Sequence, residues 1–345
     1  AEISQGTLQA IFEFQTLICQ LTGMEISNAS MYDGSSALAE AVLMAARISR
    51  RNRLLIAETV HPEYRLVVDT YTRHQKLILE TVGCQQSSCV DQKNLESLMG
   101  PDVGAVVVQS PNFLGNLESL ESIATLCHKH GALLVVNITE LLSLGIVRSP
   151  GEFGADLVCG EAQSLGIPAS YGGPHIGFLA AREIFVRNLP GRLVGQTEDS
   201  KGRRGFVLTL STREQHIRRE KATSNICTNQ NLMALMVAIY CSLLGQKGIR
   251  EVAIQNVAKT QYCINALKRL PCEILFQGPR FNEFVLNLKQ PFDEVAKTFY
   301  SAGVIPGLPL GRYYPDLKHA LLVSVTETKS KKDIDRLVEL VASVV

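Results

Sequence analysis

The chain has 345 residues, which is enough for about two domains, one with a large core and one smaller. Its residues are 46% hydrophobic and 19% charged, against about 25% charged in an ordinary soluble domain, which excludes a disordered or collagen-like chain. Because 34 basic and 33 acidic side chains leave a formal net charge of +1, no overall field would attract nucleic acid or anionic lipid. The longest apolar runs fall far short of the ~20 residues that cross a bilayer, so we expect no membrane partner.

The cysteines and the first residues of the sequence indicate the cellular compartment in which the chain is found. The 9 cysteines form no CxxC pair, so neither a zinc site nor a disulfide framework is predicted, and we expect a reduced, intracellular environment. The chain begins with Ala1, and the residues up to Gly6 run into an amphipathic pattern without a charged leader. We therefore expect no signal peptide, and a chain cut from something longer.

The first half of the chain alternates between helical and strand patterns. Apolar periodicity predicts helices over 8–21, 37–48, 62–71, 92–99 and 117–130, and strands over 53–57, 75–81, 103–109, 132–136 and 157–159. Helices between apolar strands are typical of crossover connections on a largely parallel sheet, so the predicted class is α/β.

The second half continues this pattern and then changes. It predicts a strand over 176–180, a long polar stretch over 187–215, and a helix over 229–244. Around Gly248 the pattern resets to helices over 252–270, 291–302 and 331–344 and strands over 273–276, 283–288 and 321–325. We therefore predict a large domain over 1–247 and a small C-terminal α+β domain over 248–345.

A short polar segment, Asp33-Gly34-Ser35-Ser36, joins a strand-like piece to a helix. Backbone N–H groups and the helix dipole at such a junction could hold a phosphate or a carboxylate. The segment matches neither a P-loop nor GxGxxG, and on its own it is better explained as a serine-rich turn that only caps the helix.

Other polar residues follow predicted strands, at the edge where open α/β sheets place ligands. Asn137 comes directly after the strand over 132–136, and Glu140 follows three residues later. After the short strand over 157–159 come Gln163 and Ser164, between two glycine clusters that suggest close backbone approach. Ser164 has no nearby histidine to activate it, so a serine nucleophile is not expected.

The charge run over 213–221 is typical of a solvated helix face. The following residues, 222–230, supply more small polar side chains than one helix cap requires, and could donate hydrogen bonds to an anionic ligand. Several histidines are predicted to be surface or packing residues: His61, His74, His128, His130 and His319.

Several long blocks of this sequence together resemble one family. These blocks are Glu2 to Gly6, Tyr32-Asp33-Gly34 with Ala37 to Ala41, Gly160-Glu161 with Gln163 to Gly166, Pro190 to Gly195, Gly202 to Leu210, and Thr212 to Gln230. The resemblance is to the glycine decarboxylase P-protein of the glycine cleavage system, and within it to the first (alpha) subunit of the two-subunit form. It covers essentially the whole chain and implies an incomplete N-terminus.

The resemblance implies a fold, a reaction and partners. The implied fold is that of type I pyridoxal-phosphate enzymes, with a large mixed-sheet domain and a small C-terminal domain. The implied reaction decarboxylates glycine and transfers the aminomethyl group to the lipoyl arm of the H-protein, whose disulfide is reduced. The implied partner is subunit 2 (beta), in an α2β2 heterotetramer, and its lysine binds the pyridoxal phosphate as a Schiff base. The implied location is the cytoplasm of a bacterium or archaeon.

The residues themselves are consistent with a cofactor held by the partner. A Schiff-base lysine in this fold should follow the short strand over 157–159, yet no lysine lies between Asp156 and Arg182. Gln163 or Ser164 takes that place, and neither can form an imine. The fold also places a carboxylate beside the protonated ring nitrogen of the cofactor. Here Asn137 lies near that position and its amide cannot supply the charge; Glu140 is an alternative.

We therefore expect this chain to act in trans on the site of its partner. The fold type suggests that Thr223, Ser224, Asn225 and Asn229 reach the phosphate or substrate there, and that Glu2 lies near the shared cleft. Asp33, Gly34, Ser35 and Ser36 form a vestigial phosphate cup, which is either empty or closes that cleft. His175 is a weaker candidate.

Two alternatives remain open on the sequence. In the first, the chain is a non-catalytic scaffold that stabilises the beta subunit or docks the H-protein. In the second, it is a self-sufficient pyridoxal-phosphate enzyme that uses Lys221, although Lys221 sits in an arginine-rich run away from the expected strand.

Overall fold

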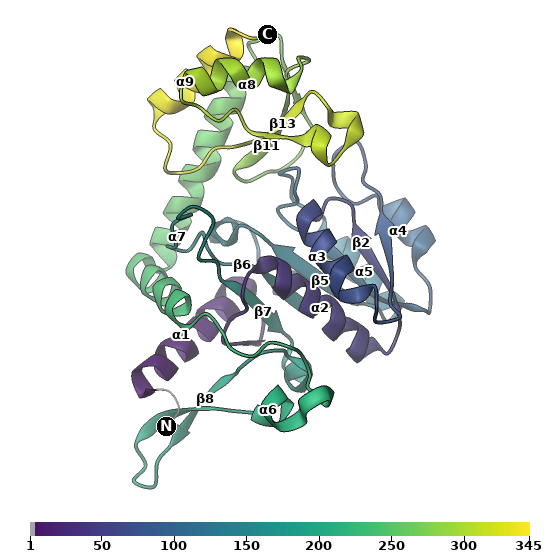
Figure 1. Ribbon diagram of the computed structural model, residues 1–345, viewed down its shortest axis with the longest axis vertical. Coiled ribbons are helices and arrows are strands. Elements are labelled where there is room, and N and C mark those ends of the chain that lie inside the picture. The colour runs from purple at the N-terminus through teal and green to yellow at the C-terminus, as the bar shows by residue number, and fades with distance from the viewer. Residues whose placement is uncertain (1–3) are drawn as a thin grey trace.

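The computed structural model describes residues 4–345 of the chain. A large unit carries most of the helices around a mixed sheet, and a smaller unit at the C-terminal end carries a second sheet (Figure 1). The helices are α1 (Gln5–Thr22), α2 (Gly34–Ser49), α3 (Pro62–Thr72), α4 (Gln92–Leu98), α5 (Leu120–Lys129), α6 (Gln215–Arg218), α7 (Asn231–Leu267), α8 (Phe292–Ser301) and α9 (Lys331–Ala342).

The large unit is built on a seven-stranded sheet in the order β1-β7-β6-β5-β4-β2-β3. The pairings among β2 to β6 are parallel, while β7 runs antiparallel to both β6 and β1. The parallel part confirms the crossover topology expected from the alternating pattern. The strands are β1 (Ile26–Ser27), β2 (Arg53–Ala57), β3 (Ile78–Val82), β4 (Val103–Gln109), β5 (Leu133–Ile138), β6 (Leu157–Glu161) and β7 (Gly177–Ala181).

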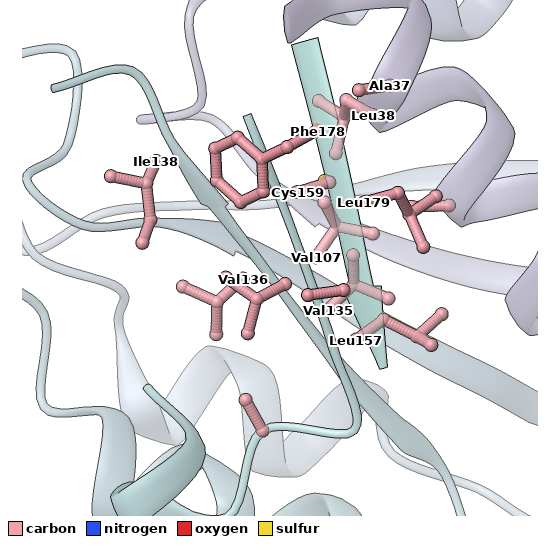
Figure 2. Packing of buried hydrophobic residues seen from close by; sticks show 14 of the residues in the cluster. Ala37, Leu38, Val107, Val135, Val136, Ile138, Leu157, Cys159, Phe178 and Leu179 are labelled. Carbon is pink, nitrogen blue, oxygen red and sulfur yellow. The ribbon is translucent and has the colours of Figure 1, made fainter. Parts of the chain in front are cut away.

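Helix α2 is central to this unit because it packs flat against the sheet. Its alanine-rich face is fully buried, and small side chains allow the helix to approach the strands closely. Figure 2 shows Ala37 and Leu38 of α2 above side chains of β4 to β7, including Phe178 and Leu179. This packing fixes the N-terminus of α2 beside the ends of β6 and β7.

The smaller unit has a four-stranded antiparallel sheet in the order β10-β11-β13-β12. Helices α8 and α9 and the C-terminal part of α7 share its core. Its strands are β10 (Glu273–Leu275), β11 (Glu283–Asn287), β12 (Leu308–Pro309) and β13 (Ala320–Ser324).

Two features differ from the sequence prediction. The polar stretch over 187–215 contains a hairpin of β8 (Val194–Glu198) and β9 (Arg204–Leu208), which packs on α1 through Phe12 and Phe206. The two helices predicted over 229–244 and 252–270 are present as the two parts of α7, but they meet at a kink at Gly245 (φ 59°, ψ −175°) rather than near Gly248. The boundary at 247/248 stays a prediction.

Helix α7 is long and apolar enough to cross a membrane, judged by length and composition alone. Its most apolar window has a mean hydropathy of 1.6, and 33% of that window is buried inside the protein. No other helix among residues 4–345 meets this criterion.

Candidate functional site

The candidate site lies at the carboxyl edge of the large sheet, where β4, β5 and β6 end. Parallel pairing places Gln109 of β4 opposite Asn137 of β5, and Asn137 opposite Cys159 of β6. The strand ends therefore bring polar side chains from distant parts of the sequence to one edge, as expected for an open α/β sheet.

Asn137 is fully buried and belongs to a network of neutral groups. Its side-chain Nδ2 donates to Oε1 of Gln109 at 3.1 Å, and the same oxygen accepts from the backbone N–H of His61 at 2.9 Å. Nε2 of Gln109 lies 3.3 Å from Oγ1 of Thr139. Asn137 thus lies at the predicted edge of the sheet, but inside β5, one residue before that strand ends, rather than just beyond it. Its side chain carries no charge with which to pair a protonated ring nitrogen.

A cavity of about 610 Å³ opens beside this network, between the two sheets. Its polar walls include His61, Glu140, Asn282 and Glu283. Burial raises the pKa of Glu140, although the hydroxyl of Ser164 and the N–H of Leu142 oppose that effect. Burial, assisted by the nearby Glu140, raises the pKa of Glu283 to about 7.

His61 is a half-buried packing residue at the rim of this cavity. Its ring lies 4.7 Å from that of Phe113 and 4.9 Å from that of Tyr64, measured between centroids. Nδ1 accepts from the N–H of Glu63 at the start of α3, and burial lowers the pKa of the imidazole. The packing role predicted for His61 is confirmed. The structure also places His61 in the wall of the cavity, which the sequence did not predict.

The residues after β6 do not fit a covalently bound pyridoxal phosphate. The segment from Asp156 to Arg182 holds no lysine. Gln163 donates from Nε2 to the carbonyl oxygen of Pro174 at 3.1 Å, and Ser164 keeps its hydroxyl near Glu140. An amide and a hydroxyl cannot form an imine, so this segment offers no group for a covalent bond to that cofactor.

Lys221, the amine of the self-sufficient alternative, is exposed and belongs to the short 3-10 helix Arg219–Lys221. It is absent from the residues that line the cavity beside Asn137. This geometry does not favour that alternative.

The segment Asp33 to Ser36 caps α2 and is satisfied within the chain. Asp33 is the N-cap residue, and its Oδ1 accepts from the N–H of Ser36 at 2.9 Å and from the hydroxyl of Ser35 at 2.5 Å. The N–H of Gly34 donates to Oε2 of Glu161 at 3.0 Å. Asp33 therefore caps the helix, as one interpretation expects. The N–H of Gly34 faces an anionic group, which is the side-chain carboxylate of Glu161.

Glu161 is the residue at this junction that sequence reasoning missed. It ends β6 and is 8% exposed, and Nδ1 of His175 lies 3.6 Å from its Oε2. The only signal in the sequence was the pair Gly160-Glu161, which contributed to the family resemblance without suggesting a role. The structure therefore brings Asp33, Gly34, Glu161 and His175 together.

Thr223, Ser224 and Asn225 lie elsewhere. They line a second cavity, of about 590 Å³, together with Glu40 and Arg47 of α2. The segment is tied to its neighbours by the N–H of Thr223, which donates to the carbonyl of Arg213, and by Oδ1 of Asn225, which accepts from Gln215. The structure does not place these three residues at the cavity beside Asn137.

Glu40 is the buried acid of this second cavity. It is 2% exposed, and its Oε2 has no hydrogen-bond partner in the described part of the chain. Burial raises its pKa to about 7, and the positive charge of Arg47 opposes that effect.

Asn229 has a structural role in this chain. It is buried, and its Nδ2 donates to the carbonyl oxygen of Ala29 at 2.7 Å. The next N–H, of Gln230, donates to the hydroxyl of Ser30 at 2.9 Å. These bonds fix the loop that leads into Asp33. Glu2 lies outside the described residues.

The charge run over 213–221 is not uniformly solvated. Arg213 is 7% exposed and donates to the carbonyl oxygens of Leu189, Gly191 and Leu210. The prediction of a solvated helix face is therefore wrong for Arg213, because carbonyl groups of the 189–210 loop replace water around its guanidinium.

Comparison with known proteins places this geometry in a family. The model of the glycine cleavage system P-protein family matches residues 1–341. A protein of Koribacter versatilis described as "Probable glycine dehydrogenase (decarboxylating) subunit 1" is 53% identical over 343 residues, which cover 99% of this chain and 77% of that protein. A protein of Geobacillus sp. with the same description is 50% identical over 98% of this chain and 75% of its own length.

Solved structures agree with these relatives. A crystal structure of glycine decarboxylase (P-protein) of the glycine cleavage system, in inhibitor-bound form, superposes with a TM-score of 0.94. It is 44% identical and covers 100% of this chain and 77% of the solved one. A NifS-like protein at 12% identity has a TM-score of 0.73, over 98% of this chain and 88% of the solved one, and shows the type I pyridoxal-phosphate fold alone. The expected fold class is confirmed, and the chain belongs to the glycine cleavage system P-protein family.

Proposed function

We propose that this chain is the alpha subunit (subunit 1) of a glycine dehydrogenase (decarboxylating) and works only with a beta subunit. Together they decarboxylate glycine and transfer the remaining aminomethyl group to the lipoyl group of the H-protein. The pyridoxal phosphate is held by a lysine of the beta subunit, and the assembly is an α2β2 heterotetramer in the cytoplasm.

One observation supports the assignment of the cofactor to the beta subunit. The fold is that of pyridoxal-phosphate enzymes, yet the sheet edge that would hold the cofactor offers Asn137, Gln163 and Ser164. These neutral groups supply neither an amine for an imine nor an anion for a protonated ring. Glu140 lines the cavity at this edge and is the alternative anion, but no amine follows β6, so a chain with this edge needs a partner that supplies the lysine.

The surface of α7 supports association with a partner. Leu232, Leu235, Ile239 and Leu243 are 65%, 38%, 50% and 81% exposed, and their spacing places them along one side of the helix. A row of exposed large apolar side chains is typical of a protein interface. We assign this row to contact with the beta subunit.

The test is reconstitution from separately purified subunits. We expect exchange between the glycine carboxyl group and CO2 to occur only when this chain, the beta subunit and the lipoylated H-protein are mixed. The chain alone, incubated with pyridoxal phosphate, should show no visible absorbance band that borohydride shifts. Mass spectrometry should find no reduced lysine adduct on it. Exchange by the chain alone, or such an adduct at Lys221, would overturn the proposal.

A further inference from the structure

The carboxylate of Glu161 sits at the N-terminus of α2 and is held there by backbone groups. Its Oε2 accepts from the N–H of Gly34 at 3.0 Å. Its Oε1 accepts from the N–H of Ile176 at 3.0 Å and from that of Gln163 at 3.2 Å. Because both oxygens receive N–H donors, the arrangement suits the ionised carboxylate, which accepts at both oxygens.

The position itself favours a negative charge. Helix α2 is 16 residues long, and the partial positive charge at its N-terminus attracts anions. Nδ1 of His175 lies 3.6 Å from Oε2 of Glu161. Burial raises the pKa of Glu161, while its three N–H donors and His175 act in the opposite direction. A carboxylate thus occupies an anion position made by two strand ends and a helix.

Close packing of two glycines brings the backbone of the junction against Glu161 and its neighbours. A Cβ atom added at Gly34 would lie 2.5 Å from Oη of Tyr64 and 3.0 Å from Cβ of Glu161. One added at Gly177 would lie 2.2 Å from the carbonyl oxygen of Asp33. The two glycines therefore let the backbone approach Tyr64, Glu161 and Asp33 closely, and the carboxylate of Glu161 already occupies the N–H groups that an anion would need.

We infer that Glu161 is a built-in anion that replaces a phosphate ester at the N-terminus of α2 and closes this chain's own cup to phosphate. Asp33 completes the closure, because it accepts from the N–H of Ser36, which would otherwise face an incoming anion. The inference concerns the isolated chain and does not depend on what the beta subunit does.

The test compares the full chain with Glu161→Ala, Glu161→Gln and a control, Glu118→Ala. Glu118 is also a buried carboxylate. It comes just before α5, but its carboxylate accepts from the N–H of Val90 and from the side chains of Asn112 and Thr59, and not from N–H groups of that helix. Each protein is titrated with inorganic phosphate against chloride of equal ionic strength. Binding is followed by phosphorus NMR line broadening and by Tm.

The expected results separate charge from volume. Wild type should show no phosphate-specific change. Glu161→Ala should melt about 5 °C lower and should recover part of that loss in millimolar phosphate, because the phosphate enters the space left by the carboxylate. Glu161→Gln should lose stability but bind no phosphate, since its amide still fills the junction. Glu118→Ala should lose stability without recovery in phosphate.

Two results would overturn the inference. One is phosphate binding by the wild-type chain that Glu161→Gln changes, because the cup would then be open. The other is a folded Glu161→Ala variant that responds to phosphate no more than Glu118→Ala does. If Glu161→Ala does not fold, the comparison of wild type with Glu161→Gln still decides, since phosphate binding by either one contradicts a closed cup.

Discussion

The side-chain amide of Asn137 donates to that of Gln109 at 3.1 Å, at the point where their two strands end. This bond turns the edge of the sheet into a neutral, closed network, because the same oxygen of Gln109 also accepts from the N–H of His61. A carboxylate in place of Asn137 could not donate to that oxygen unless it were protonated. The polarity of this edge therefore depends on one amide.

Asn137→Asp should accordingly destabilise the chain in a pH-dependent way. At pH 8 the new carboxylate would be buried against the oxygen of Gln109, and we expect a loss of about 3 kcal/mol in the free energy of unfolding. At pH 5 a protonated carboxyl can donate the missing bond, so the loss should shrink. Urea unfolding at both pH values measures the difference. Asn52→Asp, at an exposed position, should change little at either pH. An equal loss for Asn137→Asp at both values would contradict the explanation.

The raised pKa of the buried Glu40 should make the free energy of unfolding depend on pH. Burial raises its folded-state pKa from 4.5 to about 7, above that of the unfolded chain. Its contribution is therefore fully present below the unfolded pKa and is lost as the pH rises through about 7. Glu40→Gln should remove this loss, which amounts to about 3 kcal/mol at most, so the variant should gain stability relative to wild type at pH 8. The check is urea unfolding at intervals from pH 5 to pH 8. Glu121→Gln, at an exposed site, should leave the wild-type slope unchanged.

The polar loop beside Glu40 provides a test of the shared-site proposal. In the reconstituted enzyme, the triple variant Thr223→Ala, Ser224→Ala, Asn225→Ala should lower glycine carboxyl exchange at least tenfold while the subunits still assemble. The reason is that these side chains would contact the phosphate or substrate held by the beta subunit. Size-exclusion chromatography measures assembly, and isotope exchange measures activity. Ser122→Ala with Thr125→Ala, exposed on α5, is the matched control. Full exchange by the triple variant would favour the scaffold alternative.

The sequence predicted the large sheet well because its strands are buried on both faces. Runs such as Val103–Gln109 are free of polar side chains up to their last residue, and helices separate them along the chain. The hairpin of β8 and β9 was missed because β8 is largely polar, and because both strands are partly exposed and lack the apolar alternation of a half-buried strand. Gly248 was taken as the break in the helix, whereas the backbone departs from helical angles at Gly245.

For the site, sequence reasoning could locate residues that follow strands but not contacts between distant segments. Asn137 was placed at the correct edge of the sheet because the apolar run before it marks the strand, although β5 continues through Asn137 to Ile138. Glu161 was missed because its partner, Gly34, lies 127 residues earlier, and no local pattern links the two. Arg213 was misassigned because a charge run does not reveal that one member points into carbonyl groups.

The part of α7 that follows Gly245 packs in the hydrophobic cores of both the large and the small sheet. Ile249 and Ala253 pack in the core of the large sheet, while Cys263, Ile264 and Leu267 pack in that of the small sheet. At 1.5 Å per residue, the stretch from Ile249 to Leu267 is a rod about 27 Å long. Glu140 and Glu283 face the same cavity from opposite sides of this joint. Opening or closing that cavity would require the rod to bend or slide, so the spacing between the two acids is mechanically constrained.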